Sequence, residues 1–191
     1  MFALRYLVAI VCLLKGVTAS GDPLDALATK SSLSGTFTQS IVSPEGLLLE
    51  QAEGRFQLLR PDYFWWRIQV PDQQLLVAVD GQLTQIDWDL EVVTRRDFSP
   101  QDRTVLQWLL ASREEIERVF TVERQGQLLK LAAREMDAPV VDLTIEYSRD
   151  TSLWRLTMTD RGGQVIKLAL KEELDRSLSP EDFALPTIHF D

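Results

Sequence analysis

The side chains able to do acid–base, nucleophilic or metal chemistry are scarce in this sequence. Its 191 residues include one histidine, His189, and one cysteine, Cys12. Histidine is the commonest general acid or base near neutral pH, and structural zinc sites need several cysteine or histidine ligands. We therefore expect a binding protein rather than an enzyme, with no bound metal and no cofactor.

Two acidic groups are the other candidates for proton transfer or cation binding. Asp87 and Asp89 flank a predicted turn, and Glu172-Glu173-x-Asp175 follows a predicted strand. Aspartate is common in turns because its side chain bonds to nearby backbone amides. We therefore interpret both groups as solvated. Gly162-Gly163 is typical of a turn, since no helix begins after it to bind a phosphate.

The region that organises the chain is residues 54–94, where apolar side chains recur with the two-residue period of a strand. Phe64, Trp66 and Ile68 alternate with Trp65 and with polar side chains. Successive side chains of a strand point to opposite faces of a sheet. One face of this strand is therefore strongly apolar, and Trp65 is expected on the other face, partly exposed.

Turn signals separate the strands of this region. Arg60-Pro61-Asp62 interrupts the alternation, because proline cannot donate a hydrogen bond to a sheet ladder. Asp80-Gly81 follows the nearly continuous apolar run of residues 75–79 and predicts a tight hairpin turn. Two more short strands are expected between residues 83 and 94. The region predicts a meander of four or five strands with a large apolar face.

Strand patterns continue on both sides of the meander. Residues 35–42 and 47–59 lead into it, with an irregular point near Gly54. Five more strands are predicted after it, at residues 120–124, 128–133, 140–147, 153–159 and 165–170. Together these patterns predict a mainly β protein whose antiparallel sheet has about eleven strands.

Helix start signals occur between and beside the strands. Asp22-Pro23 and Ser99-Pro100 each place a capping residue before a proline at the first helical position. Ser112 and Glu115 have the spacing of a capping box and predict a helix over residues 113–119. Such helices are expected to bury their apolar stripes against the apolar face of the sheet.

The first 19 residues have the pattern of a secretory signal peptide, with an apolar core over residues 7–14 and small residues up to Ala19. Residues 20–191 are then expected to form a single domain. Cys12 lies inside the signal, after a valine rather than the small residue of a lipidation signal. Residues 1–19 hold two basic and no acidic side chains, so their removal takes the formal net charge from −9 to −11. This charge disfavours nucleic acid and anionic membranes as partners.

An ordered series of residues in the meander is more specific than its strand pattern. The series is Gly54, Phe56, Arg60-Pro61, Phe64, Trp66, Pro71, Leu76-Val77, Asp80-Gly81 and Asp87-x-Asp89-Leu90-Glu91-x-Val93. Weaker matches are Phe37-Thr38-Gln39, Gly162-Gly163-Gln164 and Phe183-x-Leu185-Pro186. With these residues the chain resembles the LolA family, the periplasmic carriers of outer-membrane lipoproteins.

The resemblance implies an incomplete β-barrel of about eleven strands covered by a helical lid, with a cavity that holds the acyl chains of lipoproteins. Arg60 matches an arginine that holds the lid through hydrogen bonds to backbone carbonyls. The other lid candidates are Leu106, Leu109 and Leu110. The predicted cavity residues are Phe37, Phe56, Phe64, Trp66, Ile68 and Leu76.

The resemblance also implies a place and partners. The protein would be a monomer in the periplasm of a Gram-negative bacterium. It would take lipoproteins from an inner-membrane release transporter and pass them to an outer-membrane acceptor.

Several alternatives stay open at this stage. The aromatic residues and the lid leucines could be ordinary core residues, and Arg60 could be a solvated hairpin residue. Thr84 and Ile86 stand where the family commonly has aromatic residues, and Trp88 where it commonly has proline. The cargo could therefore be another apolar molecule, such as a glycolipid or a polyene. A periplasmic lipid-sensing module without transport is the alternative class.

Overall fold

The computed structural model describes residues 23–98, 111–136, 138, 140–173 and 177–190. The first six strands are β1 (Ser32–Val42), β2 (Leu48–Leu59), β3 (Tyr63–Val70), β4 (Gln74–Val79), β5 (Gln82–Asp87) and β6 (Val92–Asp97). The other five are β7 (Phe120–Gln125), β8 (Leu128–Ala133), β9 (Val140–Ser148), β10 (Leu153–Asp160) and β11 (Val165–Glu172).

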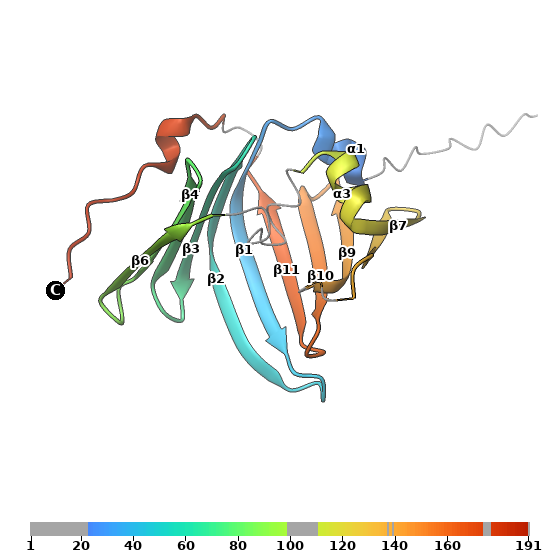
Figure 1. The fold of residues 1–191 in the computed structure, drawn as a ribbon, viewed down its shortest axis with the longest axis horizontal. Helices are drawn as coiled ribbons and strands as arrows, with labels where there is room; N and C mark the ends of the chain where they lie inside the picture. Colours follow the sequence, from blue (N-terminus) through green and yellow to red (C-terminus); the bar gives the residue numbers. More distant parts are fainter. Residues whose placement is uncertain (1–22, 99–110, 137, 139, 174–176, 191) are drawn as a thin grey trace, which may run out of the picture.

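These strands form one antiparallel sheet in the order β6-β5-β4-β3-β2-β1-β11-β10-β9-β8-β7. The pairing of β1 with β11, from Gly35 opposite Glu172 to Val42 opposite Val165, joins the two sequential runs of strands. Within the described residues β6 and β7 are the two ends of the sheet, which curves into an open, incomplete barrel (Figure 1). The predicted fold class is confirmed.

Short helices lie at one end of this sheet. α1 (Pro23–Ala28) and α3 (Arg113–Val119) are neighbours there, and the 3-10 helix η2 (Pro180–Phe183) lies near β4 (Figure 1). The predicted capping box of α3 is confirmed. The backbone amide of Glu115 donates to the Ser112 hydroxyl at 3.2 Å, and the amide of Ser112 donates to the Glu115 carboxylate at 2.8 Å.

Two predicted segments lie outside the described residues. They are the signal peptide, residues 1–19, and the helix after Ser99 with the lid candidates Leu106, Leu109 and Leu110. Both stay predictions.

The tight turn predicted at Asp80-Gly81 is confirmed. Val79 pairs with Gln82, which leaves a two-residue loop, and both loop residues have positive φ, 51° at Asp80 and 74° at Gly81. Positive φ at both positions is the type I′ geometry, whose twist matches that of the flanking strands. The turn therefore sets the register of β4 against β5.

The two faces of the sheet are apolar to different extents. We call one face of the sheet the inner wall. The main core covers it across the sheet order from β5, next to one edge, to β7 at the other edge. This core includes Leu24 and Leu27 of α1 and Ile116 of α3. The opposite face carries a smaller group, the outer cluster, whose buried members are Leu75, Val77 and Ile86. Trp65 is half-buried against the outer cluster, as predicted for its face.

Candidate functional site

The inner wall of β1, β2 and β3 carries a cluster of aromatic rings. Trp66 lies at its centre. The ring of Phe37 stacks on Trp66 with centroids 3.5 Å apart, and the ring centroids of Phe56 and Phe64 each lie 6.4 Å from that of Trp66. All four rings are at most 5% exposed. The structure therefore brings four predicted cavity residues together on one face.

Backbone pairing explains why these residues meet. Phe56 of β2 lies directly opposite Trp66 of β3, and Trp66 lies opposite Leu76 of β4. Directly opposed residues in an antiparallel pair have their side chains on the same face. The strand period puts Phe56, Trp66 and Leu76 on one face, and the register of β2, β3 and β4 brings them side by side.

The absence of a side chain at Gly54 leaves room for the Phe37 ring on the inner wall. Phe37 pairs with Gly54, where the ladder between β2 and β3 has the irregularity predicted from the sequence. A Cβ atom at Gly54 would lie 1.9 Å from the carbonyl oxygen of Arg67 and 2.7 Å from the Phe37 ring. No larger residue fits this close approach, so glycine is needed for the aromatic cluster to form.

Ile68 and Leu76 differ from the four aromatic residues in burial. Both pack against the main core, yet they are only partly buried. They form the accessible part of the predicted cavity set.

Arg60 lies at the corner between β2 and β3 and contacts the end of α1. Its Nε donates to the carbonyl oxygen of Lys30 at 2.9 Å, and its Nη2 donates to the carbonyl oxygen of Leu27 at 3.3 Å. The last carbonyls of a helix have no partner within the helix, and a guanidinium can bind several of them at once. Arg60 therefore ties the end of α1 to the rim of the sheet.

Two ion pairs hold the same helix. Lys30, just after α1, pairs with the Glu172 carboxylate at the end of β11. The indole Nε1 of Trp154 donates to that carboxylate at 3.4 Å. At the other end of α1, Asp25 accepts from Arg113 of α3 at 2.6 Å. The helix is thus fixed by polar contacts to three separate parts of the chain.

Both acidic groups were predicted to be solvated, and this was wrong for one residue of each. Glu172 is 8% exposed, because it lies in β11 over Trp154 with Lys30 as its partner. Asp87 is 6% exposed and accepts a hydrogen bond from the backbone amide of Leu90 at 2.9 Å. Asp89 accepts from the amide of Gln73 at 2.6 Å. Asp87 therefore stabilises its own turn, and Asp89 links that turn to the loop before β4.

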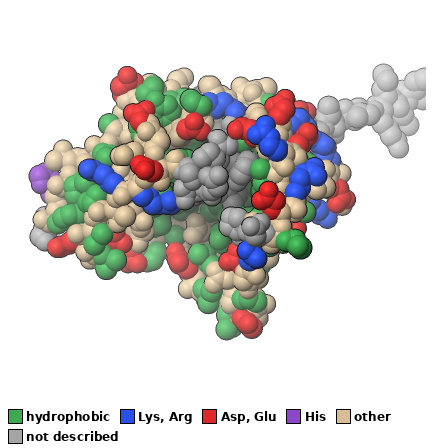
Figure 2. All heavy atoms as spheres, in the orientation of Figure 1, with side chains coloured by type: hydrophobic (Ala, Val, Ile, Leu, Met, Phe, Trp, Pro, Cys, Tyr) green, Lys and Arg blue, Asp and Glu red, His purple; other side chains and the backbone are tan. Residues whose placement is uncertain are grey.

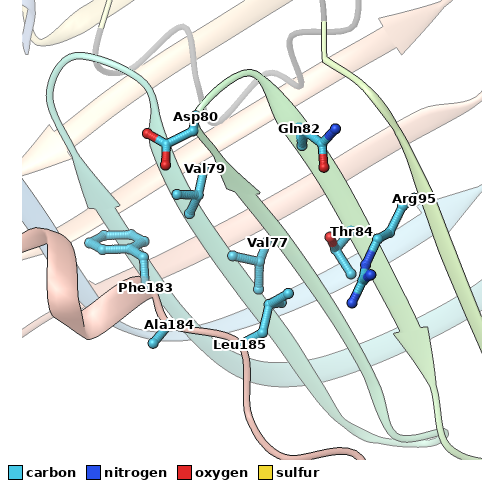
Figure 3. Close-up of a pocket in the computed structure, with 9 residues that line it drawn as sticks. All are labelled: Val77, Val79, Asp80, Gln82, Thr84, Arg95, Phe183, Ala184 and Leu185. Atoms are coloured by element: carbon cyan, nitrogen blue, oxygen red, sulfur yellow. The ribbon is translucent and has the colours of Figure 1, made fainter.

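A hollow lies on the outer face, and none of the predicted cavity residues lines it (Figure 3). It has a volume of about 450 Å³ and lies between β4, β5 and β6 and the segment after η2. Val77 and Leu185 supply apolar walls, and Arg95 and Gln82 supply polar ones. Thr84, noted as a departure from the family pattern, lines this hollow, and Ile86 is buried in the outer cluster. Neither contributes to the inner wall.

The described parts of the chain hold neither a metal-binding cluster nor a membrane-spanning helix. No group of three or more His, Cys, Asp or Glu side chains is placed to hold a metal ion there. No helix within the same residues has the length and apolar character needed to cross a membrane.

The open sheet, its aromatic inner wall and the helices tied over one end define a half-barrel protein with an apolar inner face. A family model described as "Outer membrane lipoprotein carrier protein LolA" matches residues 28–186. The chain belongs to this family, as the ordered series of residues in the meander predicted.

Individual relatives agree with this assignment. An outer-membrane lipoprotein carrier protein of Bordetella pertussis is 31% identical over 162 residues, which cover 82% of this chain and 77% of the relative. A protein of the same name from Vibrio cholerae is 28% identical, over 84% of this chain and 82% of the relative.

A solved structure of an outer membrane lipoprotein-sorting protein domain from Vibrio parahaemolyticus is also similar, at 11% identity. It aligns over 84% of this chain and 92% of its own length with a TM-score of 0.49.

Proposed function

We propose that this protein is a periplasmic carrier that binds the acyl chains of lipoproteins on its inner wall and delivers them towards the outer membrane. Membership of the LolA family supports this proposal. The structural observation that carries it is the aromatic cluster around Trp66, continued by the partly buried Ile68 and Leu76. Residues 1–19 act as the export signal, and residues 20–191 are the carrier domain.

A carrier is needed because acyl chains are costly to place in water. At about 0.8 kcal/mol per methylene, a chain of about sixteen carbons costs on the order of 12 kcal/mol. A wall of aromatic and aliphatic side chains removes most of this cost. Directional polar groups on the wall would add little, which fits its composition.

Release requires that the bound chain can be displaced. We propose that the helices form a lid that competes with the acyl chain for the inner wall, and that Arg60 holds the lid when the wall is empty. α1 supports this model because Leu24 and Leu27 already occupy part of the main core. Leu106, Leu109 and Leu110 would add to the same lid. Cargo would come from an inner-membrane transporter and pass to an outer-membrane acceptor.

The inner wall can be tested with charge substitutions at its accessible positions. Ile68→Glu and Leu76→Glu place a carboxylate where the acyl chain would lie, at sites that are only partly buried. Val79→Glu is the matched control, because Val79 lies on β4 like Leu76 but packs on the outer cluster. We expect both inner variants to bind a fluorescent palmitoylated peptide at least tenfold more weakly, with the control close to wild type. Equal binding by all three variants would overturn the proposal.

The lid can be tested at Arg60. Arg60→Leu removes the hydrogen bonds to the end of α1, so the lid should compete less well and bound lipid should be released more slowly. Arg55→Leu is the control, because Arg55 instead pairs with Glu173 on the surface. Transfer of a loaded lipopeptide to acceptor vesicles should slow at least tenfold in the first variant only. Normal transfer by Arg60→Leu would remove Arg60 from the mechanism.

A further inference from the structure

The hairpin of β1 and β2 extends beyond β3, while β11 pairs with β1 as far as Val42, the last residue of β1. β2 begins at Leu48 but pairs with β3 only from Glu53, opposite Val70. Five residues of β2 therefore project past the end of β3, a length of about 16 Å for an extended strand. The protruding hairpin is visible below the body of the molecule in Figure 1.

Three consecutive leucines lie at the tip of this hairpin. Leu47 is 66% exposed, Leu48 is 56% exposed and Leu49 is 53% exposed. Leu49 falls at a bulge, because Ile41 pairs with Glu50 while Val42 pairs with Leu48. A bulge re-aims side chains and interrupts the strict alternation of faces. Scattered single apolar residues are normal on a surface, but three adjacent leucines on a protrusion form a patch.

The turn that presents the leucines is well defined. The amide of Ser43 donates to the carbonyl of Leu47 at 2.8 Å, and the amide of Gly46 donates to the carbonyl of Ser43 at 2.9 Å. The Ser43 hydroxyl donates to the Glu45 carboxylate at 2.8 Å, and this hydrogen bond lowers the pKa of Glu45. The tip is therefore an ordered structure with a charged carboxylate at its apex.

Charge within the segment that forms the tip is of one sign, and the adjoining β10–β11 turn adds the exposed Arg161. Glu45, Glu50 and Glu53 are all exposed, and residues 43–53 contain no lysine or arginine. Figure 2 shows hydrophobic and acidic side chains together on the protrusion. A lipid bilayer suits this surface poorly, because insertion would dehydrate the apex carboxylate and anionic lipids would repel it. A protein surface can cover the leucines and pair the glutamates at the same time.

We propose that the leucine tip, residues 47–49 with the flanking glutamates, is a docking surface for a protein partner that offers an apolar groove bordered by lysine or arginine. The tip is separate from the aromatic inner wall, so docking leaves the cargo in place. This inference goes beyond the carrier function and does not depend on which molecule the inner wall binds.

A defined probe tests this chemistry on the mature chain. The probe is an 18-residue helical peptide with leucines on one face and lysines on the other, compared with a peptide that has glutamates in place of the lysines. Binding is followed by backbone amide chemical shifts. We expect the largest shifts in residues 43–50 and binding at least tenfold weaker for the glutamate peptide.

Variants assign the binding to the tip. Replacement of Leu47, Leu48 and Leu49 by serine should weaken binding of the lysine peptide at least tenfold. The fold should be unaffected, because these side chains are exposed. Leu90→Ser is the matched control, since Leu90 is 72% exposed in a different turn, and it should change binding less than twofold. An unchanged dissociation constant in the triple variant, or shifts centred on the inner wall, would overturn the proposal.

Vesicle flotation tests whether the leucine tip inserts into a membrane instead of docking on a protein. Phosphatidylcholine vesicles without protein should not carry the wild-type chain in flotation. If they do, and the triple serine variant does not float, the tip is a membrane-inserting element and the protein-docking proposal is wrong.

Discussion

The inner wall and the outer cluster share strands β3, β4 and β5, yet their apolar surfaces are covered in different ways. Ile188 and the segment around Leu185 cross the outer face, where Ile188 packs on the outer cluster and Phe183 lies 5.4 Å from the ring of Tyr63. The inner wall is continuous along the sheet, and short helices held by polar contacts pack on it. The outer face is thus covered by irregular chain, whereas the proposed function requires the tethered helices to move from the inner wall so that it can bind a guest.

The largest expected effect separates stability from cargo binding on the two faces. Phe56→Ala on the inner wall and Leu75→Ala in the outer cluster remove fully buried side chains. Each should lower the free energy of unfolding by about 3–5 kcal/mol, from lost transfer energy and a residual cavity. Urea denaturation measures this loss.

Bound lipopeptide should distinguish Phe56→Ala from Leu75→Ala. A ligand present at a hundredfold excess over its dissociation constant stabilises the protein by about 2.7 kcal/mol. This gain should persist in Leu75→Ala and shrink in Phe56→Ala when denaturation is repeated with lipopeptide. The comparison between the two faces fails if both variants keep the gain.

The second effect concerns the tethers of α1. Lys30→Met leaves the Glu172 carboxylate buried without its cation, which should cost about 3 kcal/mol. Thermal or urea unfolding checks the loss. In the double variant Lys30→Met with Glu172→Gln, most of the stability should return because no buried charge is left. A double variant as unstable as Lys30→Met would show that the ion pair is not the cause.

The third effect concerns the outer cover. Ile188→Ser removes a half-buried side chain from the outer cluster and should cost about 1 kcal/mol. Lipopeptide affinity should stay within twofold of wild type, because the inner wall is unchanged. A large loss of lipid binding in this variant would mean that the two faces are coupled.

The smallest effect is a pH dependence of stability at Glu181, in the short helix η2 that precedes the segment covering the outer face. A hydrogen bond from Ser179 lowers the pKa of Glu181 from its usual 4.5. A lowered pKa stabilises the folded state above pH 4.5, and this contribution is lost as the pH falls through the lower folded value. The effect is small because Glu181 is exposed. Carboxyl NMR titration should show the low pKa in wild type and a value nearer 4.5 in Ser179→Ala.

The sequence predicted the sheet well because its strands alternate and its turns have distinctive residues. Asp80-Gly81 permitted only a tight turn, and Ser112 with Glu115 marked the start of α3. Gly54 was correctly identified as an irregular point. These are local signals, in which the residues that determine the structure lie within a few positions of one another.

Long-range partners were not predictable in the same way. Glu172 was expected to be solvated because its partner, Lys30, is 142 residues away in the sequence. The outer cluster was also missed, although the nearly continuous apolar run of residues 75–79 is the pattern of a strand buried on both faces. That run, together with Trp65, could have indicated a second covered face.

The most direct measurement is mass spectrometry of the lipid extracted from protein purified from the periplasm, for wild type and for Ile68→Glu. We expect acylated lipopeptides in the wild type and their loss from the folded variant, with Val79→Glu keeping them. A glycolipid or polyene in their place would keep the inner wall as the site but change the cargo. Wild-type protein that carries no lipid, under conditions that preserve its fold, would contradict the account.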